Sequence, residues 1–444
     1  MNTRALMIAA PRSGGGKTTT TLGLLTALRK KGLQVQAAKT GPDYIDPAFH
    51  EVATGRPSLN LDSWTMSGDM LEAMLADAAQ GADILLIESA MGLFDGLMGP
   101  QGARGAPSDI AQRFGIPVLL VLDVSGQGQS AAATAHGFAT LNPDVNVVGV
   151  VLNQVGSERH LTMASEAIRS AGLKVLGAFM RDPTLQLPER HLGLVQAREQ
   201  SELNALLSTL GTRAEASLDI DAIIAGAQEI TPVRHDVQTI PPPGQRIAVA
   251  DDQAFSFFYS HLARSWRLAG AVIVPFSPMA DEAPDPSCDA CWLPGGYPEL
   301  HGPQLASASH FHDGLRRFAQ SHPVHGECGG FMVLGRAIED AQGVVHPMTG
   351  LLDHVTTFAR RKMNLGYREA TLMHDCALGA KGDILRGHEF HYARISEAGS
   401  DEPLAMLRDG NGKDLGPAGA WRGHVSGSFF HVMAARHEGS FNEQ

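Results

Sequence analysis

A run of small residues near the start of the chain has the composition of a phosphate-binding loop. The segment Ala10–Thr20 reads APRSGGGKTTT, follows an apolar run and opens a helix-like stretch. Glycines let several backbone N–H groups face phosphate oxygens, and the helix N-terminus adds a favourable dipole. In such a loop Lys17 reaches the β/γ-phosphates and the Thr18 hydroxyl binds Mg²⁺. The residues expected to hold a nucleotide here are Ser13, Gly14, Gly15, Gly16, Lys17 and Thr18.

The match to the strict loop pattern is incomplete, because Pro11 stands where that pattern has its first glycine. The alternative is an ordinary glycine-rich turn with a solvated lysine. The context between a strand and a helix favours the phosphate loop.

Carboxylates at neighbouring strand ends are candidates for the metal site that such a loop needs. Asp43 and Asp46 lie in KTGPDYIDPAFH, and Glu88 ends the apolar run of LLIESAMGLFDG, with Asp95 later in the same loop. The first two could instead be turn or helix-capping residues. Glu88 could be structural, although a carboxylate on an apolar strand is costly without a partner.

Two polar residues close other apolar strands in this half of the chain. Asn153, in GVVLNQVGSERH, could read a purine edge or could cap a turn. Asp123 ends VLLVLD, and we expect it to be structural.

A second chemical centre is predicted near the C-terminus by HGECGGFMVLG. Small residues around Cys328 permit a strained strand-to-helix elbow. Such an elbow exposes the sulfur at a helix N-terminus and lowers the thiol pKa, which makes a better nucleophile. His431, in HVSGSFFHVMAA, is the candidate general base. The alternative for Cys328 is a small buried apolar residue.

Adjacent glycines after a further apolar run could stabilise an oxyanion near this thiol. The run LPGGYPE contains Gly295 and Gly296, whose N–H groups could act together with that of Gly329. A plain type II turn is the alternative reading.

The remaining cysteines and histidines give weaker signals. Cys288 and Cys291 form C-x-x-C, but no second ligand pair follows at zinc spacing, so we do not expect zinc. His388 and His391 in GHEFHY could be ligands or core residues.

The elements that must position these residues alternate in type through the first half of the chain, which predicts a parallel, doubly wound α/β sheet. Ligands on such sheets bind at the carboxyl ends of strands. The expected strands are 6–10, 34–39, 84–88, 118–123, 145–152 and 174–179, and the expected helices are 17–30, 129–141 and 159–170.

The domain boundary is predicted from a change of composition. Residues 231–245, TPVRHDVQTIPPPGQ, contain four prolines and no apolar period, and we read them as a linker. A second α/β pattern starts at Arg246, with strand ends near Pro294 and His325. We therefore expect one domain at 1–230 and another at 246–444.

Composition excludes several classes of protein. The net charge is −12 and no long basic run appears, so we expect no nucleic-acid partner. The sequence contains no apolar run of about 18 residues, so we expect no membrane span. Four cysteines do not form a disulfide framework and suit a cytoplasmic protein.

With these residues in view, the chain resembles the cobyrinic/hydrogenobyrinic acid a,c-diamide synthase family of cobalamin biosynthesis. The resemblance covers essentially the whole chain. Its most specific elements are KTGPDYIDPAFH, ESAMGLFDG, LNQVGSERH, LPERHLGL, LPGGYPEL, GECGGFMVLG and GHEFHY, in family order.

The resemblance implies a dethiobiotin-synthetase-like P-loop domain and a class I glutamine amidotransferase-like α/β domain. It implies that MgATP phosphorylates acetate side chains of a corrinoid polycarboxylic acid, and that ammonia from glutamine then amidates carboxylates a and c in turn. Carried over by motif, Asp46 and Glu88 join Thr18 as Mg²⁺ residues, and Asp43, Tyr44 and Asp95 position the substrate. Cys328 is then the glutaminase nucleophile and His431 its base.

One departure concerns the third member of the thiol centre. Related amidotransferases often carry Glu two residues after the histidine, where this chain has Met433. The centre is therefore either a dyad or a triad completed by another acid.

The alternatives are a cobyric acid or nickel-tetrapyrrole amidase, or a regulatory P-loop ATPase with a non-catalytic glutaminase-like domain. The APRSGGGK form of the loop resembles aerobic-pathway members, which favours hydrogenobyrinic acid, the cobalt-free ring, over cobyrinic acid. The sequence leaves open whether the chain forms a homodimer.

Overall fold

The computed structural model describes residues 3–182, 189–190, 193–194, 196–199, 202–233, 235, 237, 239–359 and 362–436. Half of the LPERHLGL motif, at positions 187, 188, 191 and 192, lies outside these residues, as do positions 234, 236 and 238 of the expected linker. The chain divides into two compact units, Met1–Val237 and Gln238–Gln444. Within the described residues, no helix combines the length and the apolar character that crossing a membrane requires.

The N-terminal unit is built on one sheet, whose strands run in the order β3-β2-β4-β1-β5-β6-β7 and pair in parallel. A short strand, β10, pairs with β1 in the antiparallel sense. The six strands predicted from the sequence are all present, with ends shifted by up to three residues, while β3 and β10 were not predicted. The strands are β1 Thr3–Ala9, β2 Val35–Thr40, β3 Leu59–Leu61, β4 Ile84–Glu88, β5 Val118–Asp123, β6 Val147–Val155, β7 Val175–Met180 and β10 Gln228–Ile230, besides a separate pair, β8 Glu189–Arg190 and β9 Gly193–Leu194.

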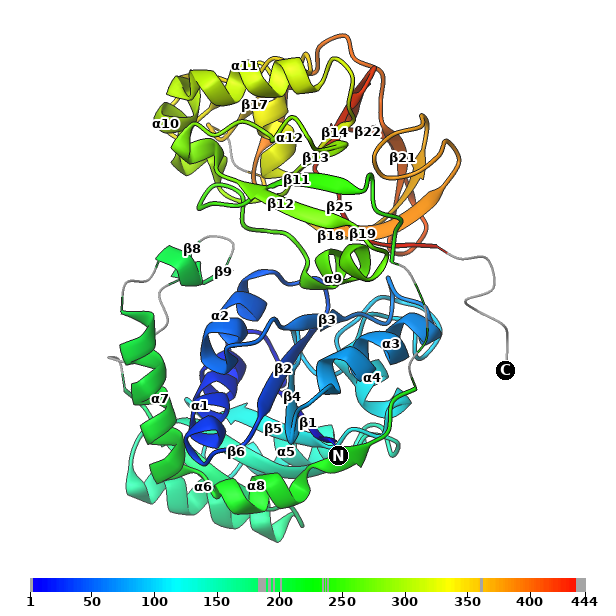
Figure 1. The fold of residues 1–444 in the computed structure, drawn as a ribbon. Helices are drawn as coiled ribbons and strands as arrows, with labels where there is room; N and C mark the ends of the chain where they lie inside the picture. The colour runs from blue at the N-terminus through cyan, green and yellow to red at the C-terminus, as the bar shows by residue number, and fades with distance from the viewer. Residues whose placement is uncertain are drawn as a thin grey trace. The chain divides into compact units, whose positions relative to one another are not determined.

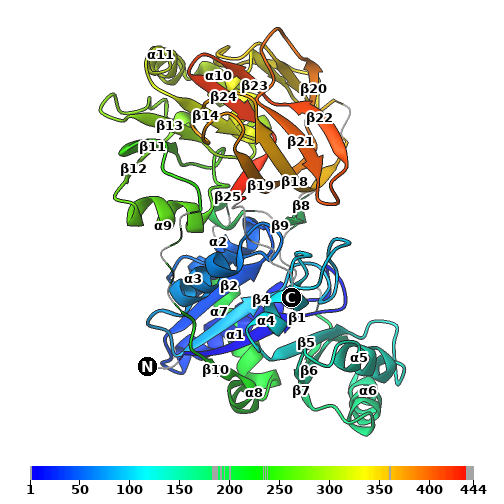
Figure 2. The same ribbon diagram turned by 90° about the vertical axis from the view of Figure 1, so that its right-hand side faces the viewer.

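Helices cover both faces of this sheet, as the doubly wound prediction requires (Figures 1 and 2). Successive residues of β5 point to opposite faces, so Leu119 and Val121 join the core beneath α1 and α7, while Leu120 and Leu122 join the core beneath α5 and α6. The helices are α1 Lys17–Lys30, α2 Ile45–Thr54, α3 Gly68–Ala79, α4 Pro107–Arg113, α5 Ala131–Thr140, α6 Glu158–Ser170, α7 Leu203–Ser217 and α8 Ile220–Gly226, with the short η2 Ala197–Glu199.

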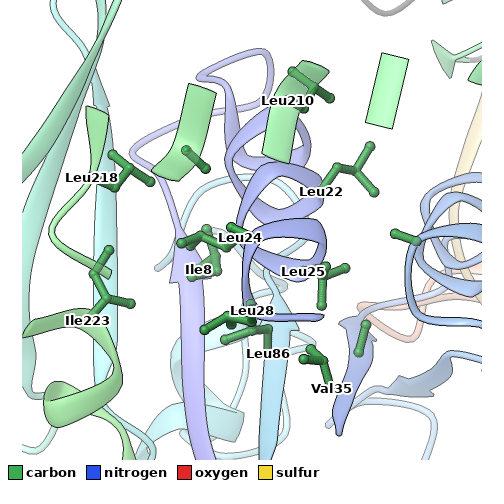
Figure 3. Close-up of a cluster of buried hydrophobic side chains, with 14 of the residues drawn as sticks. Ile8, Leu22, Leu24, Leu25, Leu28, Val35, Leu86, Leu210, Leu218 and Ile223 are labelled. Carbon is green, nitrogen blue, oxygen red and sulfur yellow. The ribbon is translucent and has the colours of Figure 1, made fainter. Parts of the chain in front are cut away.

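Figure 3 shows the larger of these cores, where leucines of α1 meet strand residues on one side and α7 and α8 on the other. Leu24 and Leu28 lie against Ile8 and Leu86, and Leu22 lies near Leu210 of α7. All are buried, and burying one such side chain stabilises the fold by about 1.5–3 kcal/mol. This packing fixes α1 on the sheet, and so fixes the loop that precedes it.

The C-terminal unit contains a sheet in the order β12-β11-β13-β14-β24-β23, parallel except for β23 at its edge. Its strands are β11 Arg246–Ala250, β12 Val272–Phe276, β13 Ala290–Leu293, β14 Val324–Glu327, β23 Ala420–Arg422 and β24 Val425–Ser428. Its helices are α9 Ser260–Leu268, α10 Gly302–Ser307, α11 Ser309–Phe318 and α12 Gly329–Leu334, with η3 Pro278–Ala280 and η4 Pro298–Leu300.

Two further sheets in this unit were not predicted. One is antiparallel, in the order β22-β21-β18-β19-β25 (Figure 2), and β25 carries His431 at its first position. The other has the order β16-β15-β17-β20. Their strands are β15 Ala337–Glu339, β16 Val345–Pro347, β17 Val355–Thr357, β18 Asn364–Leu372, β19 Ile384–His391, β20 Arg394–Glu397, β21 Ala405–Asp409, β22 Asp414–Ala418 and β25 His431–Ala435.

Candidate active site

The glycine loop lies between β1 and α1, as the sequence predicts. Gly14 and Gly16 have φ of 70° and 92°, a region that favours glycine. A Cβ on Gly16 would lie 2.0 Å from Nδ2 of Asn153, which itself donates to the Gly15 carbonyl at 3.2 Å. The loop and the end of β6 therefore pack too closely for any side chain at position 16.

Lys17 is folded back over the loop that it follows. Its Nζ donates to the Arg12 carbonyl at 3.0 Å, and its side chain is buried. Burial, followed by the charge of Lys39, lowers the pKa of Lys17 to about 8. A phosphate near Nζ would oppose both effects, because its negative charge favours the protonated amine.

Buried charges converge beside the loop, at the carboxyl ends of β2 and β4. Lys39 and Glu88 are paired in register, and Lys39 Nζ donates to Glu88 Oε1 at 2.9 Å and to Asp46 Oδ2. Thr18 Oγ1 donates to the same Glu88 oxygen at 2.7 Å and lies 3.5 Å from Asp46 Oδ2. The structure thus brings together all three residues expected to bind Mg²⁺.

The two carboxylates of this cluster have shifted pKa values. Burial, followed by the charge of Asp43, raises the pKa of Asp46. Burial acts in the same direction on Glu88, but Lys39 and the hydrogen bond from His50 outweigh it and lower the pKa of Glu88. For Lys39, burial opposes the charge, but Asp46 and Glu88 outweigh it and raise the pKa.

These oxygens fit Mg²⁺, which prefers hard ligands and is usually held by one or two carboxylates together with substrate phosphates. In the part of the chain that the structure describes, no group of three or more His, Cys, Asp or Glu side chains could hold a metal by itself. Asp46, Glu88 and Thr18 offer two carboxylates and one hydroxyl, fewer ligands than the octahedral set that Mg²⁺ takes.

Lys39 and His50 belong to this site and were not singled out from the sequence. His50 is fully buried, and its Nε2 donates to Glu88 Oε2 at 2.7 Å while Nδ1 lies 3.2 Å from Ser58 Oγ. The available signal was that both lie in KTGPDYIDPAFH, with Lys39 at the end of a buried strand. A buried lysine next to two acids is a site feature rather than a core residue.

The residues expected to contact substrate flank the charged cluster. Asp43 Oδ1 accepts from the N–H of Ile45 at 2.7 Å, which makes it a capping residue of α2, while Oδ2 lies 3.7 Å from Lys39 Nζ. Tyr44 precedes α2 and is half-buried. Asp95 Oδ2 accepts from the N–H of Gly92 at 3.0 Å.

The 92–95 turn lies against the phosphate loop. A Cβ on Gly92 would lie 2.5 Å from the Pro11 carbonyl oxygen, and the N–H of Leu93 donates to Ala10. Arg12 forms an ion pair with Asp123 at 2.9 Å, so Asp123 has the structural role expected of it.

In the C-terminal unit, Cys328 forms the predicted elbow between β14 and α12. Its φ of 46° and ψ of −101° lie in a strained region for a residue with a side chain. The flanking glycines permit the turn, since a Cβ on Gly330 would lie 2.0 Å from the Leu293 carbonyl oxygen and one on Gly326 would lie 2.7 Å from Gly330.

The prediction of an exposed sulfur with a lowered pKa is wrong. Cys328 is only 4% exposed, and burial, followed by the charge of Glu299, raises the thiol pKa. The N–H of Gly329 acts in the opposite direction on the sulfur but is outweighed. The thiol is therefore held protonated and needs a base when it reacts.

His431 approaches this elbow from the antiparallel sheet. A Cβ on Gly295 would lie 2.4 Å from Cε1 and 3.3 Å from Nε2 of His431, and 3.4 Å from Cβ of Cys328. The Nε2 edge of the imidazole and the Cys328 side chain thus flank the same glycine. Met433, two residues further along β25, is fully buried.

The glycines proposed for an oxyanion site also come together. A Cβ on Gly329 would lie 2.9 Å from the backbone nitrogen of Gly296, and one on Gly296 would lie 2.0 Å from the Ala254 carbonyl oxygen. Gly295 is held by its carbonyl, which accepts from the N–H of Phe257 at 2.9 Å.

The histidines of GHEFHY are core residues beside His431. His388 stacks on His431 with ring centroids 5.1 Å apart, and its Nδ1 lies 3.2 Å from the Tyr259 hydroxyl. Burial, followed by His431, lowers the pKa of His388. Burial also lowers the pKa of His391 to about 4. The cysteines of C-x-x-C, Cys288 and Cys291, are buried as well.

Two family models match this chain, one in each half. Residues 6–195 match the family model of the CobQ/CobB/MinD/ParA nucleotide binding domain, and residues 246–439 match that of the CobB/CobQ-like glutamine amidotransferase domain.

Curated relatives align over nearly their full length. A hydrogenobyrinate a,c-diamide synthase of Mesorhizobium japonicum is 59% identical, and one of Agrobacterium fabrum is 58% identical, each over 98% of this chain and 99% of the relative. One of Rhodobacter capsulatus is 52% identical over 97% of this chain and 99% of the relative. A solved glutamine amidotransferase is 20% identical over 42% of this chain and 89% of its own, with a TM-score of 0.30.

Proposed function

This chain belongs to the family of hydrogenobyrinate a,c-diamide synthases, and we propose that it converts the a and c acetate carboxylates of a corrinoid into amides, using ATP and glutamine. The observation that carries the proposal is that one chain holds two complementary centres. One is a phosphate loop with paired carboxylates, and the other is a cysteine–histidine pair beside close-packed glycines.

The chemistry requires both centres. A carboxylate is a poor electrophile until one of its oxygens has become part of a phosphate leaving group. ATP supplies that phosphoryl group, giving an acyl phosphate and ADP. Ammonia from glutamine then attacks the acyl carbon and phosphate leaves, so that each cycle converts one carboxylate into an amide.

In the N-terminal unit, we assign the nucleotide phosphates to the loop 13–18 and to Lys17. Mg²⁺ bound by Thr18, Asp46 and Glu88 would neutralise charge on the phosphates. We also assign a nucleotide contact to Asn153, whose side chain packs on the loop.

We assign the substrate carboxylate to the region of Asp43, Tyr44 and Asp95, beside the charged cluster. The acids would repel a carboxylate directly, so we give them the role of holding amide or Mg²⁺ partners. Lys39 offers a compensating charge, since its Nζ lies 3.7 Å from Asp43 and contacts both carboxylates proposed to bind Mg²⁺.

In the C-terminal unit, Cys328 attacks the side-chain amide of glutamine and His431 takes the thiol proton. The N–H groups of Gly295, Gly296 and Gly329 are our candidates for stabilising the oxyanion that forms. Ammonia in water is mostly ammonium at neutral pH, which explains why one chain carries both the source and the consumer. All four cysteines are free, which suits the reducing cytoplasm, where we place the reaction.

Turnover of defined corrinoids tests the proposal. Purified protein is incubated with ATP, Mg²⁺, glutamine and either hydrogenobyrinic acid or its cobalt-containing counterpart, and the products are analysed by mass spectrometry. We expect two carboxylates to become amides through a monoamide, with preference for the cobalt-free ring. Four or more amidations, or no amidation of either ring, would contradict the assignment, and preference for the cobalt form would overturn the choice of ring.

A further inference from the structure

The carboxylate of Glu327 is buried next to the proposed base of the thiol centre. Glu327 is the last residue of β14 and immediately precedes Cys328. Its Oε2 lies 3.8 Å from Nδ1 of His431, and both side chains are only 1% exposed. A buried carboxylate is costly without partners, so this arrangement calls for a reason.

The backbone around Glu327 fixes where its carboxylate points. Glu327 pairs in register with Ser428 of β24, and the N–H of Cys328 donates to the Ser428 carbonyl at 2.8 Å. Glu327 Oε1 accepts from the N–H of Val432 at 2.9 Å. One oxygen is therefore anchored to β25, which leaves the other facing the imidazole of His431.

The two nitrogens of His431 face different partners. Cε1 and Nε2 lie toward Gly295, which also lies next to Cβ of Cys328, and Nδ1 lies toward Glu327. In a working general base, one nitrogen receives the proton, while a hydrogen bond at the other fixes the tautomer.

We propose that Glu327 is the positioning residue of the Cys328–His431 pair. Its Oε2 and Nδ1 of His431 lie 3.8 Å apart and would close to hydrogen-bond distance in the working site, so that Nδ1–H donates to Glu327 and Nε2 is free to take the thiol proton. The inference rests on the proposed glutaminase activity. It places the acid one residue before the nucleophile, on β14, rather than two residues after the histidine on β25.

The proton and electron balance is that of acyl transfer. The Cys328 proton moves to Nε2, and the sulfur forms a bond to the amide carbon of glutamine. The C–N bond then breaks as Nε2 gives the proton to the leaving nitrogen, which departs as ammonia. Water then hydrolyses the thioester, giving glutamate and the free thiol. Glu327 stays ionised throughout and stabilises the protonated imidazole by its charge.

The other ionisable groups near His431 are less suited to this role. His388 and His391 are buried histidines with lowered pKa values, and like His431 they would become cations on protonation. Glu389 is engaged by Arg368 at 2.7 Å. Glu299 acts on the sulfur side, where its charge raises the pKa of Cys328.

Glu327→Gln separates positioning from structural support, since the amide oxygen can still accept from Val432 while the charge is lost. We expect kcat for glutamine hydrolysis to fall about 10³- to 10⁴-fold, with a KM for glutamine within about threefold of the wild type. Synthesis with added ammonium should stay within about twofold. Glu327→Asp, which keeps the charge, should recover at least about tenfold of the lost kcat. The matched control is Glu369→Gln, which removes a carboxylate paired with Arg386 on the antiparallel sheet and should leave hydrolysis unchanged.

A second measurement locates the proton on His431 in the wild type and needs a variant only to assign the signal. Nitrogen-15 histidine NMR, assigned with His431→Gln, should show neutral His431 with its proton on Nδ1. Hydrolysis by Glu327→Gln within about threefold of the wild type, or a proton on Nε2, would overturn the inference while leaving the glutaminase assignment intact. A wild type that does not hydrolyse glutamine would instead remove the function on which the inference rests.

Discussion

The two centres of this chain are both buried, but they are organised by opposite means. In the N-terminal unit, the cluster around Lys39 holds full charges in contact, with Glu88 bound by Lys39, Thr18 and His50. In the C-terminal unit, His431 lies among histidines whose pKa values are lowered and beside a thiol whose pKa is raised. The first centre is built from paired ions, and the second mostly from neutral groups.

The difference follows from what each centre must do. Phosphoryl transfer moves charge among oxygens, and fixed opposite charges stabilise it. Thiol chemistry instead moves one proton between two groups, which therefore must start neutral. In the C-terminal unit, close backbone packing positions the reacting groups, as ion pairs do in the N-terminal unit. The close packing of Gly295 against His431 is one example.

The largest expected effect is the loss of glutamine-dependent synthesis while ammonium-dependent synthesis is kept. Cys328→Ser should reduce glutamine-dependent synthesis by at least about 10³-fold, because the hydroxyl is a much weaker nucleophile here. Synthesis with high ammonium should continue, since the N-terminal unit is unchanged. Product formation with each nitrogen donor measures both, and Cys376→Ser serves as the control cysteine. If Cys328→Ser still uses glutamine, the sulfur is not the nucleophile.

Changes in the phosphate loop should reduce synthesis but not glutamine hydrolysis. Lys17→Ala is expected to lower synthesis about 10²- to 10³-fold with either nitrogen donor, because a positive charge at the terminal phosphates is lost. Glu88→Gln should act in the same direction by removing a Mg²⁺ ligand. Glutamine hydrolysis without ATP, assayed as glutamate release, should remain near its wild-type basal value. Near-normal synthesis by Lys17→Ala would exclude the glycine loop as the γ-phosphate site. The departure from the loop pattern at Pro11 would then be the reason for doubting that site.

A smaller effect tests the claim that backbone proximity organises the thiol centre. Gly295→Ala places a methyl group 2.4 Å from Cε1 of His431, so the ring must shift. We expect glutamine hydrolysis to fall about 10- to 10²-fold, since displacements near 1 Å can cost this much. Gly137→Ala, where a Cβ meets nothing within 4 Å, is the control. Equal activity of both variants would show that His431 tolerates displacement.

The last expected effect is on stability rather than on rate, and concerns the response of the folded chain to pH. Burial lowers the pKa of His261, His354 and His391 to about 4 and that of His325 to about 3. Below the ordinary value of 6.5, the unfolded chain binds more protons than the folded chain at these sites. Their contribution to stability is therefore present above pH 6.5 and is lost as pH falls toward 4, by about 3 kcal/mol for one such group.

This loss should be confined to the C-terminal unit. Three of the four tryptophans, Trp266, Trp292 and Trp421, lie there, so the melting temperature followed by tryptophan fluorescence should drop between pH 6.5 and 4. His325→Gln should flatten this dependence, because its amide does not titrate but can still contact Ser426 as His325 does. Asp46 acts in the opposite sense in the N-terminal unit, because its raised pKa favours folding as pH falls. A constant melting temperature across this range would contradict the expectation.

Much of the N-terminal unit could be predicted because its signals are local. The helix over 17–30 and the strands over 84–88 and 118–123 have the predicted bounds, since glycines, apolar runs and caps lie next to one another in the sequence. Lys39 was missed for a physical reason. Nothing within its strand distinguishes a buried lysine from a solvated one, and its partner Glu88 comes from a strand 49 residues later.

Less of the C-terminal unit could be predicted from the sequence. The elbow at Cys328 was predicted from its glycines. The raised pKa of its thiol was not, because it depends partly on the charge of Glu299, and the Cys328 side chain lies next to Gly295, which is also distant in the sequence. The antiparallel sheet that carries His431 was also missed, because its pairings join strands far apart in sequence, such as β19 with β25. The contact between Glu327 and His431 depends on that pairing.

The burial of Cys328 also determines how the resting enzyme meets oxidants. The thiolate, not the thiol, reacts with peroxide, and a cysteine kept protonated in an apolar surrounding is inert. Cys328 is 4% exposed and its thiol pKa is raised, so between turnovers the sulfur is shielded from sulfenic acid formation. Reactivity then appears only when glutamine occupies the centre and His431 removes the proton. On the proposed mechanism, the nucleophilic sulfur then needs no reductant to restore it between turnovers.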